Sequence, residues 1–495
     1  MARQNGRKMP MSWRDEDPGL PIEFGQCSNG EYQPERLTPL RVEMERLARS
    51  EVDDAVRRTG LSRRQFLRSA CALAVSLAAI DTTIARALGV SPGLWYPFDP
   101  VARLDTDAAN TILGPRQFVF DVQGHLLEYD LDPSTRGDWF WGRQFPQANC
   151  EDEDDPRACF ATNHFLEEIF VRSDTTMVAL SGLPILPEGS PLPPEVMEDT
   201  RKTVQALSGD ERVIVNALAL PQIAPIDSVI DEMDRTISEN VISGWKTFTH
   251  FPTNIHWWLD DHDPALPQVG NIFLDHLAEV GIPILFIHKG LSDGTRYGSP
   301  EDVGPAARAH PDVKFVIYHS GFEVGQREGP YTEATANRGV NRLITSLRKA
   351  GIGPGENVYA EIGSTWWHLL RRPDEAAHVL GKLLVAFGED NVLWGTDSIF
   401  YGSPQGQIDA LRAFQIPTET RERFGYPELT DGAKAKILGW NAVSLFDIDP
   451  ITDPVGFTVD ELEAARIEHP VPTRSWGPST TEEVREFRLH HQGWP

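Results

Sequence analysis

The chain has 495 residues, and its 40% hydrophobic and 24% charged side chains are the composition of a globular protein rather than of a disordered chain or a membrane bundle. Its formal net charge is −27, and no run rich in Lys or Arg offsets it. This argues against a nucleic-acid-binding protein, because such a surface repels phosphate. Four cysteines are too few and too scattered for a disulfide scaffold or a cysteine-rich zinc site.

Residues 1–87 are interpreted as an N-terminal extension with an export signal. The sequence SRRQFLR at residues 62–68 resembles a twin-arginine motif, an apolar run follows at residues 69–80, and residues 85–87 (Ala-Arg-Ala) have the pattern of a signal-peptidase site. The run is too short for a stable bilayer anchor. These features predict a protein that is periplasmic or exported by the twin-arginine route. If the segment is instead an amphipathic surface helix, the protein is cytoplasmic.

The first 60 residues are charged and interrupted by Pro and Gly, so we expect them to be poorly ordered. They make an unusually long leader, and Met44 is an alternative start that would shorten it.

From about residue 115, short β-rich runs alternate with helical patterns, for example at residues 226–237 and 272–280. Eight such units predict a (β/α)8 TIM barrel over residues 115–448. An open doubly wound sheet is the alternative. It predicts a glycine-rich phosphate loop, and the chain has no G-x-G-x-x-G or Walker pattern. The predicted strands are residues 118–122, 176–180, 212–218, 244–249, 283–288, 314–319, 358–362 and 392–394.

Cys150 and Cys159 bracket an acidic stretch at residues 151–155, between the first two predicted strands. The two thiols form a disulfide if the protein is exported, or they stay unpaired, and the sequence favours neither. The acidic stretch lacks the ordered spacing of an EF-hand, so we interpret it as a solvated loop rather than a calcium site.

Potential metal ligands stand at the ends of four predicted strands. Because the C-terminal ends of barrel strands face the active site, we expect these side chains to converge on one mouth. Imidazole and carboxylate are usual ligands of Zn²⁺, and of Mn²⁺ or Fe²⁺. The pattern favours a metal site over histidines that are satisfied within the core. The four residues are His125, His288, His319 and Asp397.

Together these motifs resemble the amidohydrolase superfamily. The resemblance is strongest to its amidohydrolase-related (amidohydrolase 2) branch of metal-dependent TIM-barrel enzymes, which also holds non-oxidative decarboxylases and lactone hydrolases. It covers roughly residues 115–448. The motifs are Asp121-x-Gln123-x-His125, His288, His319-Ser-Gly, Gly395-Thr396-Asp397 and the segment NAVSLF at residues 441–446, which is similar to the closing helix of the family.

The resemblance implies a role for each matching position. His125, His288 and Asp397 are the implied metal ligands, and Asp397 also takes a proton from the attacking water. His319 is implied to act as an acid or base, or to contact the metal-bound water. We expect one divalent metal, Zn in first place, with Mn or Fe as alternatives.

Gln123 departs from the family pattern, which usually has His there and in some decarboxylases Glu. A Gln oxygen is a weaker, uncharged ligand, so the expected site is mononuclear and looser, with Gln123 as a further ligand. The alternative is a pseudoenzyme without metal. Lys246 stands where binuclear members carry a carboxylated lysine. With one metal, we expect it to act on the substrate or behind the metal ligands, or to pair with Glu361.

The loop after the fourth strand is a possible lid, since it carries His250, His256 and His262 beside Trp257 and Trp258. A surface loop with scattered histidines is an equal alternative. Of these, His250 is the candidate that contacts substrate.

Further pocket candidates follow strands seven and eight. Glu361 and Tyr401 are candidate substrate contacts, and residues 364–367 (STWW) are a candidate aromatic wall.

The main functional hypothesis is a metal-dependent hydrolase that activates water to cleave a lactone, ester or amide, with Asp397, His319 and Lys246 as catalytic residues. The alternatives are a non-oxidative decarboxylase of an aromatic or unsaturated carboxylate, and a non-catalytic exported binding protein. The expected partner is a small-molecule substrate. We expect no nucleic acid and no membrane beyond the export machinery, and a homodimer is left open. Residues 449–495 are a polar tail with one predicted helix at residues 458–468.

Overall fold

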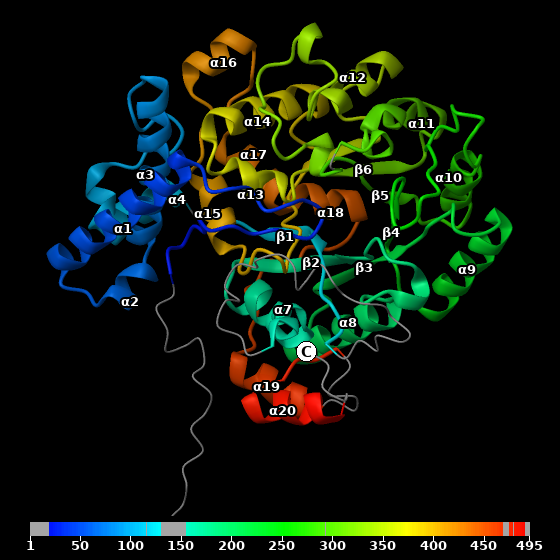
Figure 1. Cartoon of the computed structure of the whole chain (residues 1–495), viewed down its shortest axis with the longest axis horizontal. Coiled ribbons are helices and arrows are strands. Elements are labelled where there is room, and N and C mark those ends of the chain that lie inside the picture. The colour runs from blue at the N-terminus through cyan, green and yellow to red at the C-terminus, as the bar shows by residue number, and fades with distance from the viewer. Residues whose placement is uncertain are drawn as a thin grey trace, which may run out of the picture.

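Eight parallel strands follow one another in chain order around a barrel (Figure 1). This computed structural model describes residues 19–114, 116–129, 155–292, 294–468, 475–478 and 480–490. The predicted TIM barrel is confirmed, and no predicted strand boundary differs from the observed one by more than two residues. The strands are β1 (Val119–Gly124), β2 (Thr175–Ser181), β3 (Val213–Leu218), β4 (Gly244–Phe248), β5 (Ile284–His288), β6 (Lys314–Tyr318), β7 (Val358–Glu361) and β8 (Val392–Leu393).

The first and last strands close the barrel through the backbone. The Val122 amide donates to the carbonyl of Trp394 at 3.0 Å, and the His125 amide donates to the carbonyl of Ser398 at 2.6 Å. Gly124 and Ser398 form a parallel bridge. The closure therefore draws the segment after β8 against the end of β1, and this junction carries three of the predicted metal ligands, Gln123, His125 and Asp397.

Helices connect the strands and cover the outside of the barrel (Figure 1). They are α1 (Pro39–Thr59), α2 (Arg63–Leu67), α3 (Ala70–Leu88), α4 (Thr106–Leu113), α7 (Thr162–Leu166), α8 (Pro194–Ser208), α9 (Ile226–Glu239), α10 (Gly270–Glu279), α11 (Val303–Ala309), α12 (Asn341–Ala350), α13 (Thr365–Leu369), α14 (Pro373–Phe387), α15 (Gln405–Ala413), α16 (Thr418–Phe424), α17 (Asp431–Ala435), α18 (Asn441–Phe446), α19 (Val459–Glu468) and α20 (Thr481–His490).

One expectation for the N-terminal region is wrong: α1 is a regular helix of 21 residues where we expected poor order. Thr38 caps its first turn by accepting from the Arg41 amide, and Gly60 ends it in the left-handed conformation. Small and apolar residues recur on one face, which packs against α2 and α3. The buried residues of this face are Met44, Ala48, Val52 and Ala55.

The twin-arginine-like segment forms α2 and the apolar run forms α3, and both are part of the folded protein. By length and composition α3 could cross a membrane, yet 78% of its apolar window is buried. It packs against α1, α14 and α15 at one side of the barrel (Figure 1). A buried core helix and an export signal both satisfy this criterion, so export stays a prediction.

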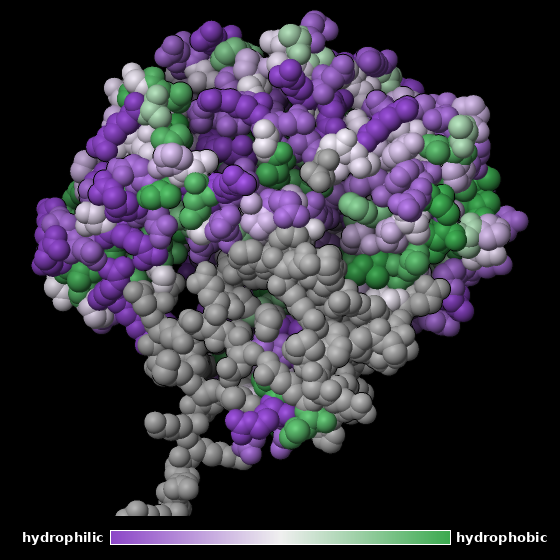
Figure 2. Space-filling view, viewed as in Figure 1, coloured by the Kyte–Doolittle hydropathy of each residue, from purple (hydrophilic) through white to green (hydrophobic). Residues whose placement is uncertain are grey.

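The C-terminal tail packs on the same chain. Phe457, Leu462 and Trp476 join a hydrophobic cluster with residues of α7 and α8, and α19 contacts both helices (Figure 1). Where the face shown in Figure 2 is not grey, hydrophilic side chains dominate it and hydrophobic ones form separate groups. This is what a strongly acidic chain predicts.

The predicted cysteine pair is only partly described. Cys27 and Cys71 are buried thiols. Cys159 is disulfide-bonded, whereas Cys150 and residues 151–154 of the acidic stretch lie outside the described residues.

Candidate functional site

The predicted site residues are buried together at the C-terminal ends of the strands. His125 follows β1, His288 ends β5, His319 follows β6 and Asp397 follows β8. None of their side chains is more than 4% exposed. In a TIM barrel this end carries the active site, because loops from all eight strands meet there.

The backbone is unusual at the same place. Four non-glycine residues adopt positive φ values, a region that costs about 1–3 kcal/mol for most side chains and that clusters at functional sites. They are His319 (φ 64°), Ser320 (φ 51°), Ser364 (φ 53°) and Asp397 (φ 59°). These sharp turns direct side chains from three strand ends into one space.

Two histidines are held in a defined tautomer by backbone carbonyls. His125 Nδ1 lies 2.7 Å from the carbonyl oxygen of Ser181, and His319 Nδ1 lies 2.8 Å from that of Gly363. A carbonyl only accepts, so each Nδ1 carries the proton and Nε2 of the neutral ring is left with a free lone pair. This is the usual arrangement of metal-binding histidines. His125 Nε2 lies 3.4 Å from Asp397 Oδ1.

His288 lies between His319 and His250. Its ring centroid is 4.7 Å from that of His319 and 5.2 Å from that of His250. Burial, together with the neighbouring His319 and Lys246, holds the pKa of His288 well below its usual value. A neutral imidazole in this position is suited to bind a metal.

Hydrogen bonds fix the Asp397 carboxylate from two sides. Oδ1 accepts from Gln123 Nε2 at 3.0 Å, and Oδ2 accepts from Asn29 Nδ2 at 2.7 Å and from Ser364 Oγ at 2.5 Å. Burial alone would raise the pKa of Asp397, but the neighbouring histidines and the hydrogen bond from Ser364 keep it below its usual value. The residue is therefore a fixed carboxylate.

Two residues of the site escaped the sequence analysis, and both lie in residues 19–36, which we name the N-terminal strap. Glu31 Oε1 is 2.9 Å from His288 Nε2, and Glu31 Oε2 is 3.8 Å from His319 Nε2. Asn29 Nδ2 donates to Glu31 at 2.6 Å as well as to Asp397. The strap has no periodic pattern or known motif, so no sequence signal marked these residues.

Glu31, His288 and His319 are a group whose potential ligand atoms all lie within 4.8 Å of one another. His125 and Asp397 lie outside this group, although Asn29 links the two halves of the site. Burial and the charge of Asp397 raise the pKa of Glu31 to about 7. The mouth therefore holds three histidines between two carboxylates.

Lys246 lies on β4 with its ammonium over aromatic rings. Nζ is 3.7 Å from the ring centroid of Tyr318 and 4.5 Å from that of Phe248, and it has no hydrogen-bond partner among the residues that the structure describes. Burial lowers the pKa of Lys246 to about 7, against the pull of carboxylates that include Glu31 and Asp397. Its predicted pairing with Glu361 is not among its hydrogen bonds or ion pairs.

Two further carboxylates lie behind the site and hold its loops. Glu361 accepts from the backbone amides of His319, at 3.0 Å, and Gly363. Asp121 accepts from the amide of Thr396 at 3.0 Å. Burial raises the pKa of Asp121 to about 7 and that of Glu361 well above its usual value. The Glu361 carboxylate, a predicted substrate contact, thus bonds to backbone amides of these loops.

The three histidines of the loop after β4 lie in different surroundings. His250 is buried beside His288, and neither of its ring nitrogens has a hydrogen-bond partner in the described part of the chain. His256 instead stacks on Tyr297, with ring centroids 4.1 Å apart, and His262 bonds to Asp260 at the surface. Only His250 of the three thus reaches the mouth.

The other pocket candidates lie at the wall of the mouth. The Tyr401 hydroxyl is 2.5 Å from Ser364 Oγ and 3.1 Å from the Tyr32 hydroxyl, and its ring stacks on Trp367.

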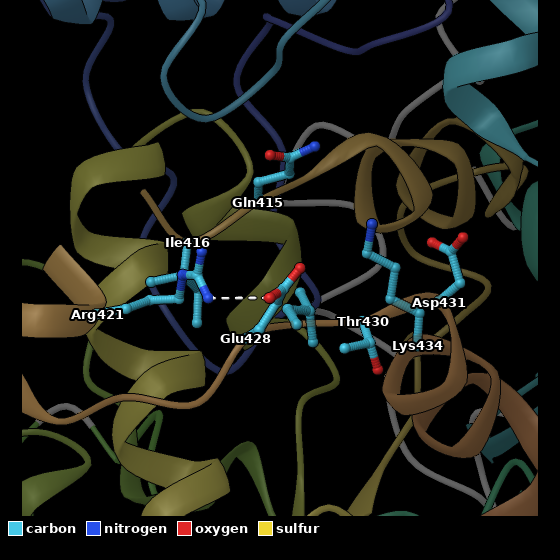
Figure 3. Close-up of a pocket in the computed structure, with 8 residues that line it drawn as sticks. Gln415, Ile416, Arg421, Glu428, Thr430, Asp431 and Lys434 are labelled. Carbon is cyan, nitrogen blue, oxygen red and sulfur yellow. Dashed lines mark hydrogen bonds and ion pairs between the residues drawn. The ribbon is translucent and has the colours of Figure 1, made fainter. Parts of the chain in front are cut away.

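A separate polar cavity of about 330 Å³ is lined by residues between Gln415 and Lys434 (Figure 3). An ion pair between Arg421 and Glu428, at 3.0 Å, crosses it. None of its lining residues belongs to the strand ends, so we assign the chemistry to the barrel mouth.

Comparisons with known proteins identify the family. The family model described as Amidohydrolase matches residues 197–448, just over half of the chain. None of the curated proteins matches it.

Three similar solved structures have low sequence identity to this chain. The 2,6-dihydroxybenzoate decarboxylase from Rhizobium is 13% identical, with 67% of this chain and 99% of that chain covered and a TM-score of 0.36. The 5-carboxyvanillate decarboxylase from Novosphingobium aromaticivorans, with bound manganese, is 15% identical, with 68% and 98% covered and a TM-score of 0.39. Amidohydrolase 2 from Bifidobacterium longum subsp. infantis is 13% identical, with 67% and 100% covered and a TM-score of 0.34.

The match of the family model runs from α8 to α18 and includes His288, His319 and Asp397. The chain belongs to the amidohydrolase family.

Proposed function

We propose that the chain is a metal-dependent hydrolase that activates water to cleave a lactone, ester or amide bond. The observation that carries the proposal is the pair of fixed tautomers: His125 and His319 present free Nε2 lone pairs beside the Asp397 carboxylate. A site built for metal and water needs such unprotonated nitrogens next to an ionised carboxylate.

Unpaired polar atoms support a metal at this position. Among the described residues, both ring nitrogens of His288, Nε2 of His319 and Oε1 of Gln123 are buried and lack a hydrogen-bond partner. Each such atom costs about 1–3 kcal/mol when it stays unsatisfied. A divalent cation bound to one nitrogen of His288 and to the Gln123 oxygen would remove part of that cost, and nitrogen and oxygen donors suit Zn²⁺, Mn²⁺ or Fe²⁺. The residues therefore fit one metal held by His125, His288 and Asp397, with Gln123 as a further oxygen ligand.

When bound, the metal would act as a Lewis acid and lower the pKa of water toward neutrality. Asp397 accepts the proton of the attacking water, because its carboxylate is ionised and is oriented by Gln123 and Ser364. The bonds to these two residues leave it little rotational freedom. The geometry of proton transfer is therefore set before substrate binds.

Protonation of the leaving group falls to His319. Its Nδ1 proton is committed to Gly363, so Nε2 takes up a proton and passes it on. Lys246 provides a positive charge for the developing oxyanion or for a substrate carboxylate, and His250 contacts the substrate from the β4 loop.

A second candidate function is decarboxylation of an aromatic or unsaturated carboxylate, and Lys246 is the observation that favours it. An unpaired, buried ammonium between aromatic rings is a natural partner for the carboxylate of a planar acid. The two reactions differ in product: hydrolysis opens a lactone, ester or amide, whereas decarboxylation releases CO₂.

The first test is the metal content of the purified protein by elemental mass spectrometry, with His288→Ala and Asp397→Asn beside the wild type. We expect about one Zn or Mn per wild-type chain and a loss of metal in His288→Ala. Loss of a general base in Asp397→Asn should lower turnover by about 10²–10⁴-fold in lactone and carboxylate screens. A folded wild type that binds no metal after reloading would contradict both reactions and favour a binding protein.

A further inference from the structure

The N-terminal strap enters the barrel mouth and is fastened there by contacts outside the metal site. In Figure 1 the dark blue segment before α1 runs from the side of the barrel to its middle and back. Four hydrogen bonds fasten it. The Arg371 guanidinium donates to the Glu23 carbonyl at 2.9 Å, and the Cys27 thiol donates to the Phe400 carbonyl at 3.2 Å. The Tyr32 and Tyr401 hydroxyls lie 3.1 Å apart, and His368 Nδ1 lies 3.2 Å from the Glu35 carboxylate.

We propose that Glu31 is a ligand of the metal, and that the N-terminal strap thereby supplies the carboxylate that β1 lacks. This inference rests on the proposed function, since it concerns the same metal. It adds a ligand from a segment more than 80 residues before the barrel begins, which no motif of the family indicates.

The spacing of the donor atoms supports this role. Two atoms that bind one Zn²⁺ tetrahedrally at about 2.0–2.1 Å lie roughly 3.3 Å apart. Glu31 Oε1 lies 2.9 Å from His288 Nε2, near that value, whereas Glu31 Oε2 lies farther away, 3.8 Å from His319 Nε2. Within the described part of the chain, His288 Nε2 has no hydrogen-bond partner. Glu31 Oε1 and His288 Nε2 are thus placed to bind one ion, with His319 beside them as the acid.

The charge of the site supports the same conclusion. With Gln123 on β1, the barrel offers one ionised ligand, Asp397, to a divalent cation. Glu31 brings a second negative charge, so that a divalent cation and its two ionised ligands together carry no net charge. Asn29 donates to both Glu31 and Asp397, at 2.6 and 2.7 Å, and so holds the two carboxylates in place against their mutual repulsion.

The fastening contacts argue that Glu31 is a permanent part of the site rather than a plug that substrate displaces. If the strap were a plug, it would have to leave the barrel mouth as a whole when substrate binds. Here the Tyr32 hydroxyl bonds to Tyr401 and the Cys27 thiol donates to a carbonyl after β8, both in buried surroundings. These bonds would have to break, unsatisfied, for the strap to withdraw.

The test compares Glu31→Gln with wild type in the full-length protein, by measuring the dissociation constants of Zn²⁺ and Mn²⁺ in competition with a chelator. Loss of even an outer partner of a metal ligand weakens binding about 10–100-fold, so we expect at least this for Glu31→Gln. Glu31→Asp, which keeps the charge on a shorter side chain, should be intermediate. Glu23→Gln makes the same chemical change in the strap at a side chain that accepts from the Gly25 amide, and it keeps the backbone contact to Arg371, so it should bind metal as the wild type does.

The outcomes separate this inference from the proposed function. If His288→Ala loses metal while Glu31→Gln retains wild-type affinity, Glu31 is no ligand and the inference is overturned, although the hydrolase proposal stands. Wild-type affinity with increased turnover in Glu31→Gln would identify a plug and also overturn it. Absence of metal from every form, wild type included, would overturn both. Thermal unfolding of each apoprotein shows whether a loss of affinity reflects a loss of fold.

Discussion

A chain of hydroxyl groups leads from the catalytic carboxylate to the strap. Ser364 Oγ donates to Asp397 Oδ2, the Tyr401 hydroxyl lies 2.5 Å from Ser364, and the Tyr32 hydroxyl follows at 3.1 Å. Burial raises the pKa of both tyrosines well above the usual value, so both keep their protons. The chain therefore stabilises Asp397 as a base and couples its orientation to the position of the strap.

Ser364→Ala should lower kcat about 10–100-fold, because a hydrogen bond to a charged group is worth about 1.5–3 kcal/mol. Metal affinity should fall as well, by about 10–100-fold, because Asp397 is also a proposed ligand and Ser364 supports it, so kcat is measured at saturating metal. Steady-state kinetics and metal titration measure both effects. Ser346→Ala, which removes an equally buried hydroxyl that donates to Glu301 on the outside of the barrel, is the control. An unchanged kcat in Ser364→Ala would show that Asp397 needs no such support.

At the residue scale, the sequence was informative wherever the barrel itself dictates position. His125, His288, His319 and Asp397 could be placed because the ends of parallel strands meet at one edge. Glu31 could not, because its position depends on how an irregular segment folds back over the mouth, which has no local sequence signature.

At the scale of elements, the strands were predictable because buried parallel strands are continuous apolar runs bounded by turn residues. Helix α1 was not, because its apolar face consists of only four residues, two of them alanines, between charged residues. The low average hydrophobicity of this segment hid an apolar stripe at positions 44, 48, 52 and 55, which packs against α3. Composition averages over the faces of a helix, and it therefore misses an element whose one buried face is narrow.

A histidine that holds the strap in place should make the unfolding free energy of the protein depend on pH. His368 Nδ1 bonds to Glu35 at 3.2 Å and its ring packs edge-on against Tyr32. Burial lowers the pKa of His368 from 6.5 to about 4. The unfolded chain therefore binds the proton first as the pH falls, and the folded chain resists it.

The stability contributed by neutral His368 is thus complete above about pH 6.5 and falls by up to about 3 kcal/mol as the pH drops to about 4. In His368→Gln, which keeps a donor for Glu35, this part of the slope should vanish. Unfolding free energies from denaturant titrations between pH 4 and 7.5 give both slopes. His262→Gln, at an exposed histidine, is the control and should follow the wild type. Parallel curves for His368→Gln and the wild type would contradict the prediction.

At the scale of the whole molecule, the N-terminal helices and the barrel share one hydrophobic core. Fourteen residues of α3 are buried, among them Leu73, Leu77, Ile80 and Ile84, in the same cluster as α14 and α15. We propose that, if the twin-arginine-like motif directs export, it does so without cleavage after Ala87. Such a cut would remove α1, α3 and the strap with Asn29 and Glu31.

A protein truncated to residues 88–495 should therefore fail to fold stably and should lose tight metal binding. Each buried Leu or Ile stabilises a fold by about 1.5–3 kcal/mol, so four of them from α3 alone match the total stability of a typical domain, about 5–15 kcal/mol. The barrel would also expose the apolar surfaces of α14 and α15 to water. A chain of residues 19–495, which keeps the helices and the strap, is the matched control. Thermal unfolding, light scattering and metal titration distinguish the two chains. If residues 88–495 stayed monomeric and bound metal as the control does, the N-terminal region would be a removable leader. The metal site would then be complete within the barrel, and the contact between Glu31 and the histidines would have no part in it.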